Sequence, residues 1–362
     1  MGSVTKTVGV DLAKQVFSVC ELDGSGRICR RLDLRRSGFT AWLAQLPAGT
    51  VVAMEACSGA HHWARRCQEY GLVPRLMAAQ FVKPFRKSQA MKNDRNDAEA
   101  IATAARQGNM RFVPVKSEGQ QARLSWHRIR EGYKAEALAI SNRLRGLLAE
   151  FGVAIAQGDG ALNRALGDTA IRCYLPAMLN DALAHLHDHW RQIQARLAEC
   201  DRRIASHAKA DTRSLRAQQI LGVGPLTADA IIATVGNGQD FRHGRQMAAW
   251  LGLTPAQHSS GGKHRMGAIS CRGDRYLRTL LIQGARSSLQ RAKAVIPQKA
   301  TPEQRWIMGL SSRLPFGKVL VAIANKHARQ LWAMLARDED YDPDAWRRHP
   351  MAQWQQAGVM SV

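Results

Sequence analysis

Four acidic residues in the N-terminal part of the chain stand where metal chemistry would need them. Asp11 and Glu55 each end a short apolar run that is typical of a buried strand. Asp94 and Asp97 are three residues apart on a predicted helix, so both project from one face of it. Buried carboxylates repel one another, and divalent cations relieve that repulsion while promoting attack on phosphodiesters. The set therefore predicts a divalent-metal site for phosphodiester chemistry.

Each of these acids also has a structural explanation when it is taken alone. Asp94 suits a helix N-cap, and Asp97 suits a first-turn acid favoured by the helix dipole. Glu55 suits the partner of a nearby arginine. Two other acids of this region, Glu99 and Asp33, are expected at the surface. The metal hypothesis therefore depends on the four residues occurring together.

A serine doublet provides the second candidate site. Within TPAQHSSGGK, Ser259 and Ser260 offer hydroxyl nucleophiles, and the glycines after them would let the backbone approach a phosphate. His258, Lys263 and Arg265 would stabilise charge developing on phosphorus. The segment is neither a lipase elbow nor a P-loop, which disfavours ester hydrolysis and nucleotide binding. The alternative is a flexible loop with no chemistry.

The charge of the chain predicts a polyanionic partner. Its 362 residues include 52 Lys plus Arg against 29 Asp plus Glu, a formal net charge of +23, and nucleic acid is the obvious match. No apolar run approaches the roughly 20 residues of a membrane span, and no signal peptide is evident, so a cytoplasmic protein without a membrane partner is expected. The seven cysteines are never spaced as CxxC, which indicates neither a disulfide framework nor a zinc site.

A second nucleic-acid element is expected around LGVGPLTA. This segment fits the turn of a helix-hairpin-helix, in which Gly222 and Gly224 would bring backbone amides close to a DNA phosphate. The alternative is an ordinary Gly-Pro helix boundary. The most basic stretch of the chain follows, and the residues predicted to bind nucleic acid there are Lys263, Arg265, Arg272, Arg275 and Arg278.

The elements that must position the acids alternate between strand and helix. The strands are expected at residues 8–11, 16–22, 27–34, 51–55 and 72–77. The first three form an antiparallel meander, and helices are expected from Phe39, over 61–70 and over 94–106. The resulting order, βββαβαβα, is that of a ribonuclease-H-like α/β domain.

Long helices follow this α/β region. Heptad seams at 133–151 and 179–204 predict a helical hairpin or a dimerising coiled coil, with two helices packed inside one subunit as an equal alternative. The expected domains are an α/β domain at residues 1–112, a helical coiled-coil region at 113–213, a mainly helical domain carrying the serines at 214–340, and a tail at 341–362.

Six motifs in this order resemble the transposases of the insertion-sequence one-ten family and their relatives, the Piv-type DNA invertases. The motifs are VGVDLAK, VAMEACSG, KNDRNDAEAIA, LGVGPLTA, WLGLTPAQHSSGGK and ISCRGDRYLRTLLIQGA. The resemblance implies a RuvC-like domain whose DEDD tetrad is Asp11, Glu55, Asp94 and Asp97. It also implies a C-terminal transposase domain with a nucleophilic serine. The family's serine–glycine pair matches Ser260, with Ser259 as the alternate.

The resemblance further implies DNA strand exchange guided by a noncoding bridge RNA. The reaction would pass through a covalent phosphoserine intermediate, with Mg²⁺ in the acidic site, in a homo-oligomer that is a dimer or tetramer. One alternative is a metal-only RuvC-like nuclease or junction resolvase, which forms no protein–DNA adduct. The other is a non-catalytic nucleic-acid-binding protein, against which the four intact carboxylates count.

Overall fold

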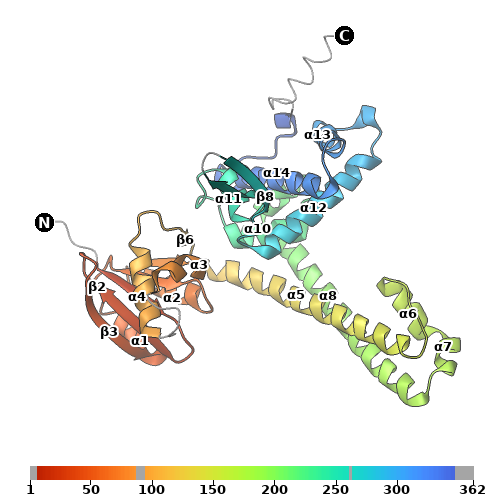
Figure 1. The fold of residues 1–362 in the computed structure, drawn as a ribbon, viewed down its shortest axis with the longest axis horizontal. Helices are drawn as coiled ribbons and strands as arrows, with labels where there is room; N and C mark the ends of the chain where they lie inside the picture. Colours follow the sequence, from red (N-terminus) through yellow and green to blue (C-terminus); the bar gives the residue numbers. More distant parts are fainter. Residues whose placement is uncertain (1–5, 87–93, 261–262, 347–362) are drawn as a thin grey trace, which may run out of the picture. The chain divides into compact units, whose positions relative to one another are not determined.

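The computed structural model describes residues 6–86, 94–260 and 263–346, with only the backbone for 258–260 and 263–265 (Figure 1). Its internal contacts divide the chain into a first unit, residues 1–118, and a second unit, residues 119–362. The expected helical region and C-terminal domain therefore belong to one unit. Most of the expected tail, 347–362, lies outside the described residues.

The first unit is built on a six-stranded sheet. Its strands are β1 (Thr7–Asp11), β2 (Val16–Leu22), β3 (Ile28–Arg35), β4 (Val51–Glu55), β5 (Val73–Met77) and β6 (Phe112–Val113). They lie in the order β3-β2-β1-β4-β5-β6. The β1–β2 and β2–β3 pairs are antiparallel, whereas β1, β4 and β5 run parallel. The five expected strands are confirmed to within a residue. The two-residue strand β6 was not expected, because so short an element has no periodicity.

Helices cover both faces of this sheet. They are α1 (Arg36–Leu43), α2 (Ala60–Glu69), α3 (Ala79–Val82), the 3₁₀ turn η1 (Lys83–Phe85) and α4 (Asp94–Ala105). The core on one face joins α1 and α2 to the sheet through Phe39, Trp63 and Val10. The core on the other face joins α4 to the sheet through Ala98 and Ala102. Because successive side chains of a strand alternate between faces, β1 serves both cores.

A single glycine sets how closely α4 approaches the sheet. A Cβ atom on Gly9, in the middle of β1, would lie 2.2 Å from the Ala98 carbonyl oxygen and 2.5 Å from the Ala102 nitrogen. The backbone of α4 therefore rests directly on the backbone of β1. This contact carries the first turn of α4 to the end of β1, where Asp11 stands.

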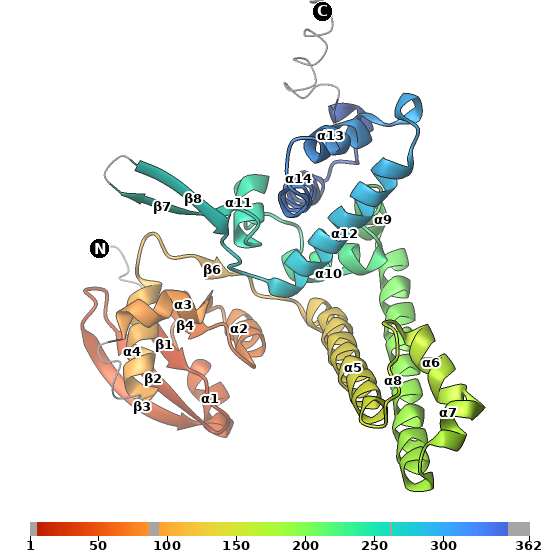
Figure 2. The same ribbon diagram turned by 45° about the vertical axis from the view of Figure 1, so that its right-hand side comes forward.

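In the second unit, α5 (Glu118–Ala149) and α8 (Ala177–Ala210) form the expected helical hairpin (Figures 1 and 2). Arg130 Nε donates to Asp201 Oδ1 at 2.5 Å, and the Arg196 guanidinium lies over the Tyr133 ring. One buried cluster takes residues from both heptad seams, among them Leu144. The seams thus pack against each other within one chain, as the intramolecular alternative requires.

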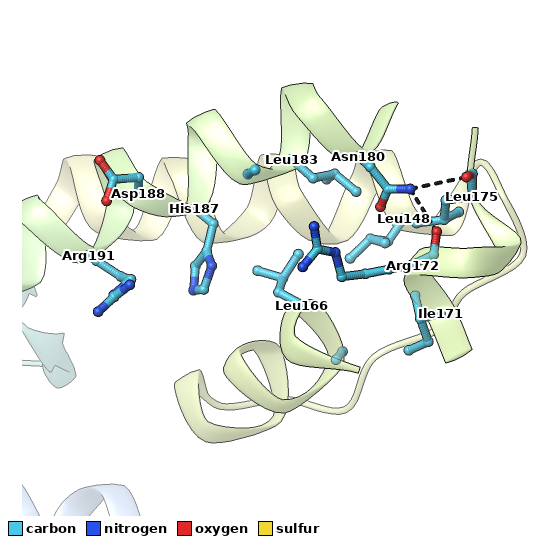
Figure 3. A pocket seen from close by; sticks show the side chains of 12 residues that line it. Leu148, Leu166, Ile171, Arg172, Leu175, Asn180, Leu183, His187, Asp188 and Arg191 are labelled. Atoms are coloured by element: carbon cyan, nitrogen blue, oxygen red, sulfur yellow. Dashed lines mark hydrogen bonds between the residues drawn. The ribbon is translucent and has the colours of Figure 1, made fainter. Parts of the chain in front are cut away.

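Two short helices, α6 (Asp159–Gly167) and α7 (Thr169–Tyr174), close the tip of the hairpin. A cavity of about 150 Å³ lies there, lined by residues of α5, α6, α7 and α8. Figure 3 shows the side chains that line it. The Asn180 amide donates to the carbonyl oxygens of Arg172 at 2.7 Å and Leu175 at 3.1 Å. These bonds fix the end of α7 onto α8.

The rest of the second unit is mainly helical, as expected. Its elements are α9 (Thr212–Ala217), α10 (Pro225–Val235), α11 (Gly244–Trp250), β7 (Pro255–Ser260), β8 (Lys263–Ile269), α12 (Arg275–Ala294), η2 (Pro297–Lys299), α13 (Pro302–Ser311), α14 (Phe316–Ala336) and η3 (Pro343–Trp346). The antiparallel β7–β8 pair was not predicted, because its polar strands lack a clear alternation. Among the described helices, none is long and apolar enough to cross a membrane.

Replacing Gly9 with alanine tests the contact between α4 and β1. The added Cβ overpacks the contact, and we expect the free energy of unfolding to fall by about 1–3 kcal/mol, measured by urea denaturation. Gly38→Ala is the matched control: Gly38 lies in α1 with no atom within 4 Å of an added Cβ, so its stability should hold or rise slightly. An unchanged urea midpoint for Gly9→Ala would show that α4 does not need this approach.

Candidate active site and nucleic-acid interface

Asp11 and Glu55 are neighbours at one edge of the sheet. Strands β1 and β4 are parallel, and Val10 pairs with Met54. The next residue on each strand is the acid, so the two carboxylates leave the sheet side by side. Both residues are partly buried. Each acid ends its strand, as expected, and the parallel pairing of β1 with β4 places the two strand ends side by side.

Helix α4 brings the other two acids to the same place. Asp94 and Asp97 lie in its first turn, with Asp94 exposed and Asp97 only 7% exposed. Burial first, and then the negative charges of Asp97, Asp94 and Glu55 in that order, together raise the pKa of Asp11 to about 6. The other three acids thus all act electrostatically on Asp11, and the metal-binding role expected of the four remains a prediction.

An arginine that the sequence analysis did not single out lies among these acids. Arg86 follows η1, and its Nη2 donates to Glu55 Oε1 at 3.2 Å. Its Nε lies 3.0 Å from Asp97 Oδ1. The guanidinium also opposes the rise in the pKa of Asp11. Glu55 does therefore have the arginine partner that its structural explanation required, but it shares that partner with Asp97.

Arg86 also bears on how the acids would receive a metal ion. Carboxylate oxygens are the donors that Mg²⁺ prefers, so the donor set fits a hard divalent cation. Within residues 6–86, 94–260 and 263–346, however, no three His, Cys, Asp or Glu side chains come close enough together to hold one. An ion shared by Glu55 and Asp97 would have to displace Arg86. The carboxylate oxygens are suitable ligands for a divalent cation. In this structure, however, Glu55 and Asp97 are arranged around the Arg86 guanidinium.

Two further acids of this unit have structural roles. Glu99 was expected at the surface, but it is only 7% exposed and forms an ion pair with Arg31. The expectation is wrong because α4 packs tightly enough on the sheet to cover this side of the helix. Asp33 is exposed, as expected. Hydrogen bonds from Arg95 and Ser18 lower its pKa.

The candidate serines lie on the β7–β8 hairpin. Ser260 is the last residue of β7 and pairs with Lys263, while Ser259 pairs with His264 and His258 with Arg265. The expected loop is therefore an ordered pair of strands as far as its backbone is described. Gly261, the other half of the serine–glycine pair, lies outside the described residues. The roles expected for these side chains remain predictions.

The base of this hairpin is clamped from the core side. A Cβ on Gly273, whose φ is +80°, would lie 1.8 Å from the Trp250 carbonyl oxygen. Arg278 Nη1 donates to the carbonyl oxygens of Leu251 at 2.9 Å and Arg272 at 3.0 Å. Arg278 thereby joins the segment before β7 to the segment after β8.

Arg278 is consequently unsuited to the phosphate contact that was expected of it. It is 8% exposed, and its guanidinium points at backbone carbonyls of its own chain. Regular spacing on α12 could not reveal this, because the carbonyl acceptors lie in segments that the fold brings together. Arg272 and Arg275 are exposed and remain candidates for nucleic-acid contact.

The glycines of the expected helix-hairpin-helix turn have different roles. Gly222 has φ +86°, and a Cβ there would lie 2.2 Å from Ser288 Oγ and 2.3 Å from the Gly284 carbonyl oxygen. Its missing side chain therefore serves packing against α12. Gly224 is the N-cap of α10, and nothing lies within 4 Å of an added Cβ. Only the second glycine borders open space.

A buried polar network joins α5, α10 and α12, and the sequence analysis missed it. Asp229 of α10 is fully buried and accepts from Arg123 Nε at 3.0 Å. His127 Nε2 lies 2.9 Å from Asp229 Oδ2, and its Nδ1 lies 2.9 Å from the Tyr276 hydroxyl. Burial raises the pKa of Asp229, but hydrogen bonds from His127 and Arg123 outweigh it and lower that pKa overall. The available signal was one acid in the apolar run TADAIIA.

Comparisons with known proteins agree on one protein class. A model of DEDD transposases matches residues 8–152, and a model described as the transposase IS116/IS110/IS902 family matches residues 215–300. A probable family 20 transposase of Pseudomonas aeruginosa is 45% identical over 93% of this chain and 98% of its own length. The transposase for insertion sequence element IS1111A of Coxiella burnetii is 38% identical over 93% and 91%. A pilin gene-inverting protein of Moraxella lacunata is 22% identical over 77% and 81%.

The α/β unit with its acids and the helical unit with its serine hairpin are thus parts of a transposase, an enzyme class that acts on DNA. The chain belongs to the IS116/IS110/IS902 family of transposases. The resemblance carried by the six sequence motifs is confirmed, and so is the relation to gene-inverting proteins.

The raised pKa of Asp11 predicts how Asp11→Asn changes stability with pH. An ionised Asp11 destabilises the folded state, so in EDTA at about pH 7.5 the variant should melt at a higher temperature than the wild type. The folded wild type takes up its proton near pH 6, ahead of the unfolded chain, whose carboxyl has the ordinary pKa of 3.8. The advantage of the variant should therefore shrink as pH falls between these values. Asp33→Asn is the control, because hydrogen bonds lower the pKa of Asp33 and so its ionised form stabilises the fold. At neutral pH this variant should melt at a lower temperature than the wild type.

Arg275→Ala and Arg278→Ala separate a surface arginine from a buried one on the same helix. Removing Arg278 leaves two buried carbonyls without their charged donor, and we expect a loss of roughly 1.5–3 kcal/mol in the free energy of unfolding. Arg275 is exposed, so its removal should keep stability and lower the slope of log affinity for DNA against log salt by about one. Equal stability of the two variants would contradict the clamp.

Proposed function

We propose that this transposase exchanges DNA strands through a covalent phosphoserine intermediate, guided by a noncoding bridge RNA. The observation that carries the proposal is the convergence of Asp11, Glu55, Asp94 and Asp97 on one electrostatic site. A partly buried carboxyl whose pKa is raised by burial and by neighbouring acids, as that of Asp11 is, is typical of a functional site. The order of strands in the sheet supports a ribonuclease-H or RuvC-like domain around this site.

The acidic site is the place for a divalent cation, which we propose to be Mg²⁺. Asp11, Glu55, Asp94 and Asp97 would hold it once Arg86 has moved from Glu55 and Asp97. Such an ion neutralises charge on a phosphodiester and promotes loss of a hydroxyl proton. The protein's own part is to bring the first turn of α4 to the ends of β1 and β4 through the packing of α4 on β1.

Ser260 is the proposed nucleophile, with Ser259 as the alternate. Its oxygen would attack phosphorus, forming a Ser–O–P bond and breaking the bond to one deoxyribose oxygen, which leaves with a proton. Attack by a hydroxyl of a new strand would reverse these steps and release the serine. Because one phosphodiester replaces another throughout, no high-energy cofactor is needed. Lys263, paired with Ser260 in the hairpin register, and Arg265 would stabilise charge on phosphorus.

The partners follow from charge and from the relatives. A net charge of +23 suits simultaneous neutralisation of DNA and RNA strands. Relatives are named as insertion-sequence transposases and as pilin gene-inverting proteins, which are both agents of DNA rearrangement. We propose a homo-oligomer, either a dimer or a tetramer, in which the acidic unit of one copy serves the serine hairpin of another.

Loss of the covalent adduct in Ser260→Ala is the expected outcome that tests this function. The assay is a denaturing gel of end-labelled donor and target DNA, incubated with full-length protein, bridge RNA and Mg²⁺. Ser260→Ala should bind its nucleic acids but give neither adduct nor recombinant, whereas Ser259→Ala should give both. Asp94→Asn should abolish recombination in a protein that remains folded.

Each other result has a definite meaning. An adduct that persists in Ser260→Ala and vanishes in Ser259→Ala moves the nucleophile by one residue. Efficient cleavage by the wild type without any adduct favours a metal-only nuclease or junction resolvase. Nucleic-acid binding without cleavage by the wild type would leave a non-catalytic binding protein.

A further inference from the structure

A polar pocket lies where the start of α10 meets the middle of α12, two helices that are in contact (Figure 2). The pocket has a volume of about 470 Å³ and is open to solvent. Thr227 lines it from α10, and Gln283, Arg286 and Gln290 line it from α12. We call it the turn pocket. None of the residues that line it is acidic, so nothing in the pocket itself opposes an anion.

The α10 side of the turn pocket offers hydrogen-bond donors with no acceptor. Pro225 occupies the first helical position and has no N–H. The N–H of Ala228 donates to the Gly224 carbonyl oxygen at 2.9 Å, but the N–H groups of Leu226 and Thr227 make no hydrogen bond to any described residue. These are the orphan donors of a helix start, where the helix dipole also favours negative charge.

The Thr227 side chain is an observation independent of the helix end. Thr227 is only 6% exposed, lines the turn pocket, and forms no hydrogen bond with the described part of the chain. Because the pocket that it lines is open, this hydroxyl can donate to a group bound there. Thr227 therefore adds a side-chain donor to the backbone donors at the start of α10.

The α12 side of the turn pocket adds positive charge. Gln283, Arg286 and Gln290 are exposed and follow one face of the helix at spacings of three and four residues. The Arg286 guanidinium has no carboxylate partner among the described residues, whereas several other arginines of the chain, such as Arg123, are paired with acids. A guanidinium left without an acid beside free amides is suited to a phosphate.

Packing holds the two walls together before any ligand arrives. Gly222 and Gly284 touch backbone to backbone, because a Cβ on Gly284 would lie 2.3 Å from the Gly222 carbonyl oxygen. The fully buried Ser288 hydroxyl donates to the Leu221 carbonyl oxygen at 2.7 Å. The turn before α10 is thus fixed onto α12, and the donors of both helices are preorganised.

We infer that the turn pocket binds one backbone phosphate of a nucleic-acid strand. The N–H groups of Leu226 and Thr227 and the Thr227 hydroxyl would donate to one side of the phosphate, and Arg286 would donate from the other. The contact reads no bases, so it holds a strand in place without selecting its sequence. The inference rests on the proposed function only in taking the ligand to be a strand that the transposase handles.

Thr227→Val and Arg286→Gln test the pocket in the full-length protein. Valine keeps the shape of threonine and removes its hydroxyl, and we expect roughly tenfold weaker binding, equal across sequences. Arg286→Gln should lower the slope of log affinity against log salt by about one. Fluorescence anisotropy with a mixed-sequence DNA duplex and a mixed-sequence single-stranded RNA gives both quantities, and loss on one probe alone identifies the strand that the pocket holds.

Arg291→Gln is the matched control, because Arg291 is an exposed arginine of α12 that does not line the turn pocket. It should change affinity less than Arg286→Gln does. Wild-type affinity and slope on both probes in Thr227→Val and Arg286→Gln would overturn the inference, and so would an equal effect of Arg291→Gln. A melting temperature close to wild type shows that each variant is folded.

The serine adduct assay is independent of these measurements. If the pocket variants bind nucleic acid more weakly but the wild type forms no adduct, phosphate binding in the turn pocket is supported and the phosphoserine mechanism is rejected. A wild-type adduct together with unaltered binding would retain the mechanism and reject the turn pocket.

Discussion

The direct contact between the backbones of α4 and β1 is the constraint on which the acidic site depends. It exists because position 9 has no Cβ, and because alanines at 98 and 102 keep the facing side of α4 small. Moved outward by the width of a methyl group, the first turn of α4 would leave the edge where β1 and β4 end. The raised pKa of Asp11, caused first by burial and then by the charges of the neighbouring acids, is sustained by this packing. The packing of α4 therefore holds Asp11 where its ionised form is unfavourable, a property typical of catalytic sites.

The same device recurs in the second unit. Gly222 meets Gly284 where the turn crosses α12, and Gly273 meets the Trp250 carbonyl at the base of the serine hairpin. In each case a missing side chain allows two backbones to touch, and a neighbouring polar side chain, Ser288 or Arg278, fixes the contact by hydrogen bonds to carbonyl oxygens. The segments that carry the candidate nucleic-acid and serine residues are held in this way on the helical core.

The arginines of this basic chain have three different roles: binding backbone carbonyls, pairing with acids, and remaining exposed at the surface. Arg278 is buried and bonds to carbonyls, Arg123 neutralises buried Asp229, and Arg86 bridges two acids of the candidate metal site. Exposed arginines such as Arg275 and Arg286 are the ones available to a nucleic acid. Net charge correctly indicated a polyanionic partner, but it could not assign individual residues, because the guanidinium serves each of these roles equally well.

The sequence by itself determined five strands of the α/β unit, the two long helices with their heptad seams, and the family, and it singled out the four acids as candidates. Strands such as 16–22 and 51–55 could be predicted because alternation and apolar runs are local properties, and the family could be identified because its motifs are contiguous. Only the tertiary structure decided that Arg86 joins Glu55 to Asp97, that Arg278 faces inward, that Glu99 is covered, and that the heptad seams meet within one chain. These facts depend on which distant segments the fold brings within a few ångströms of each other, and no local pattern of residue types records such distances.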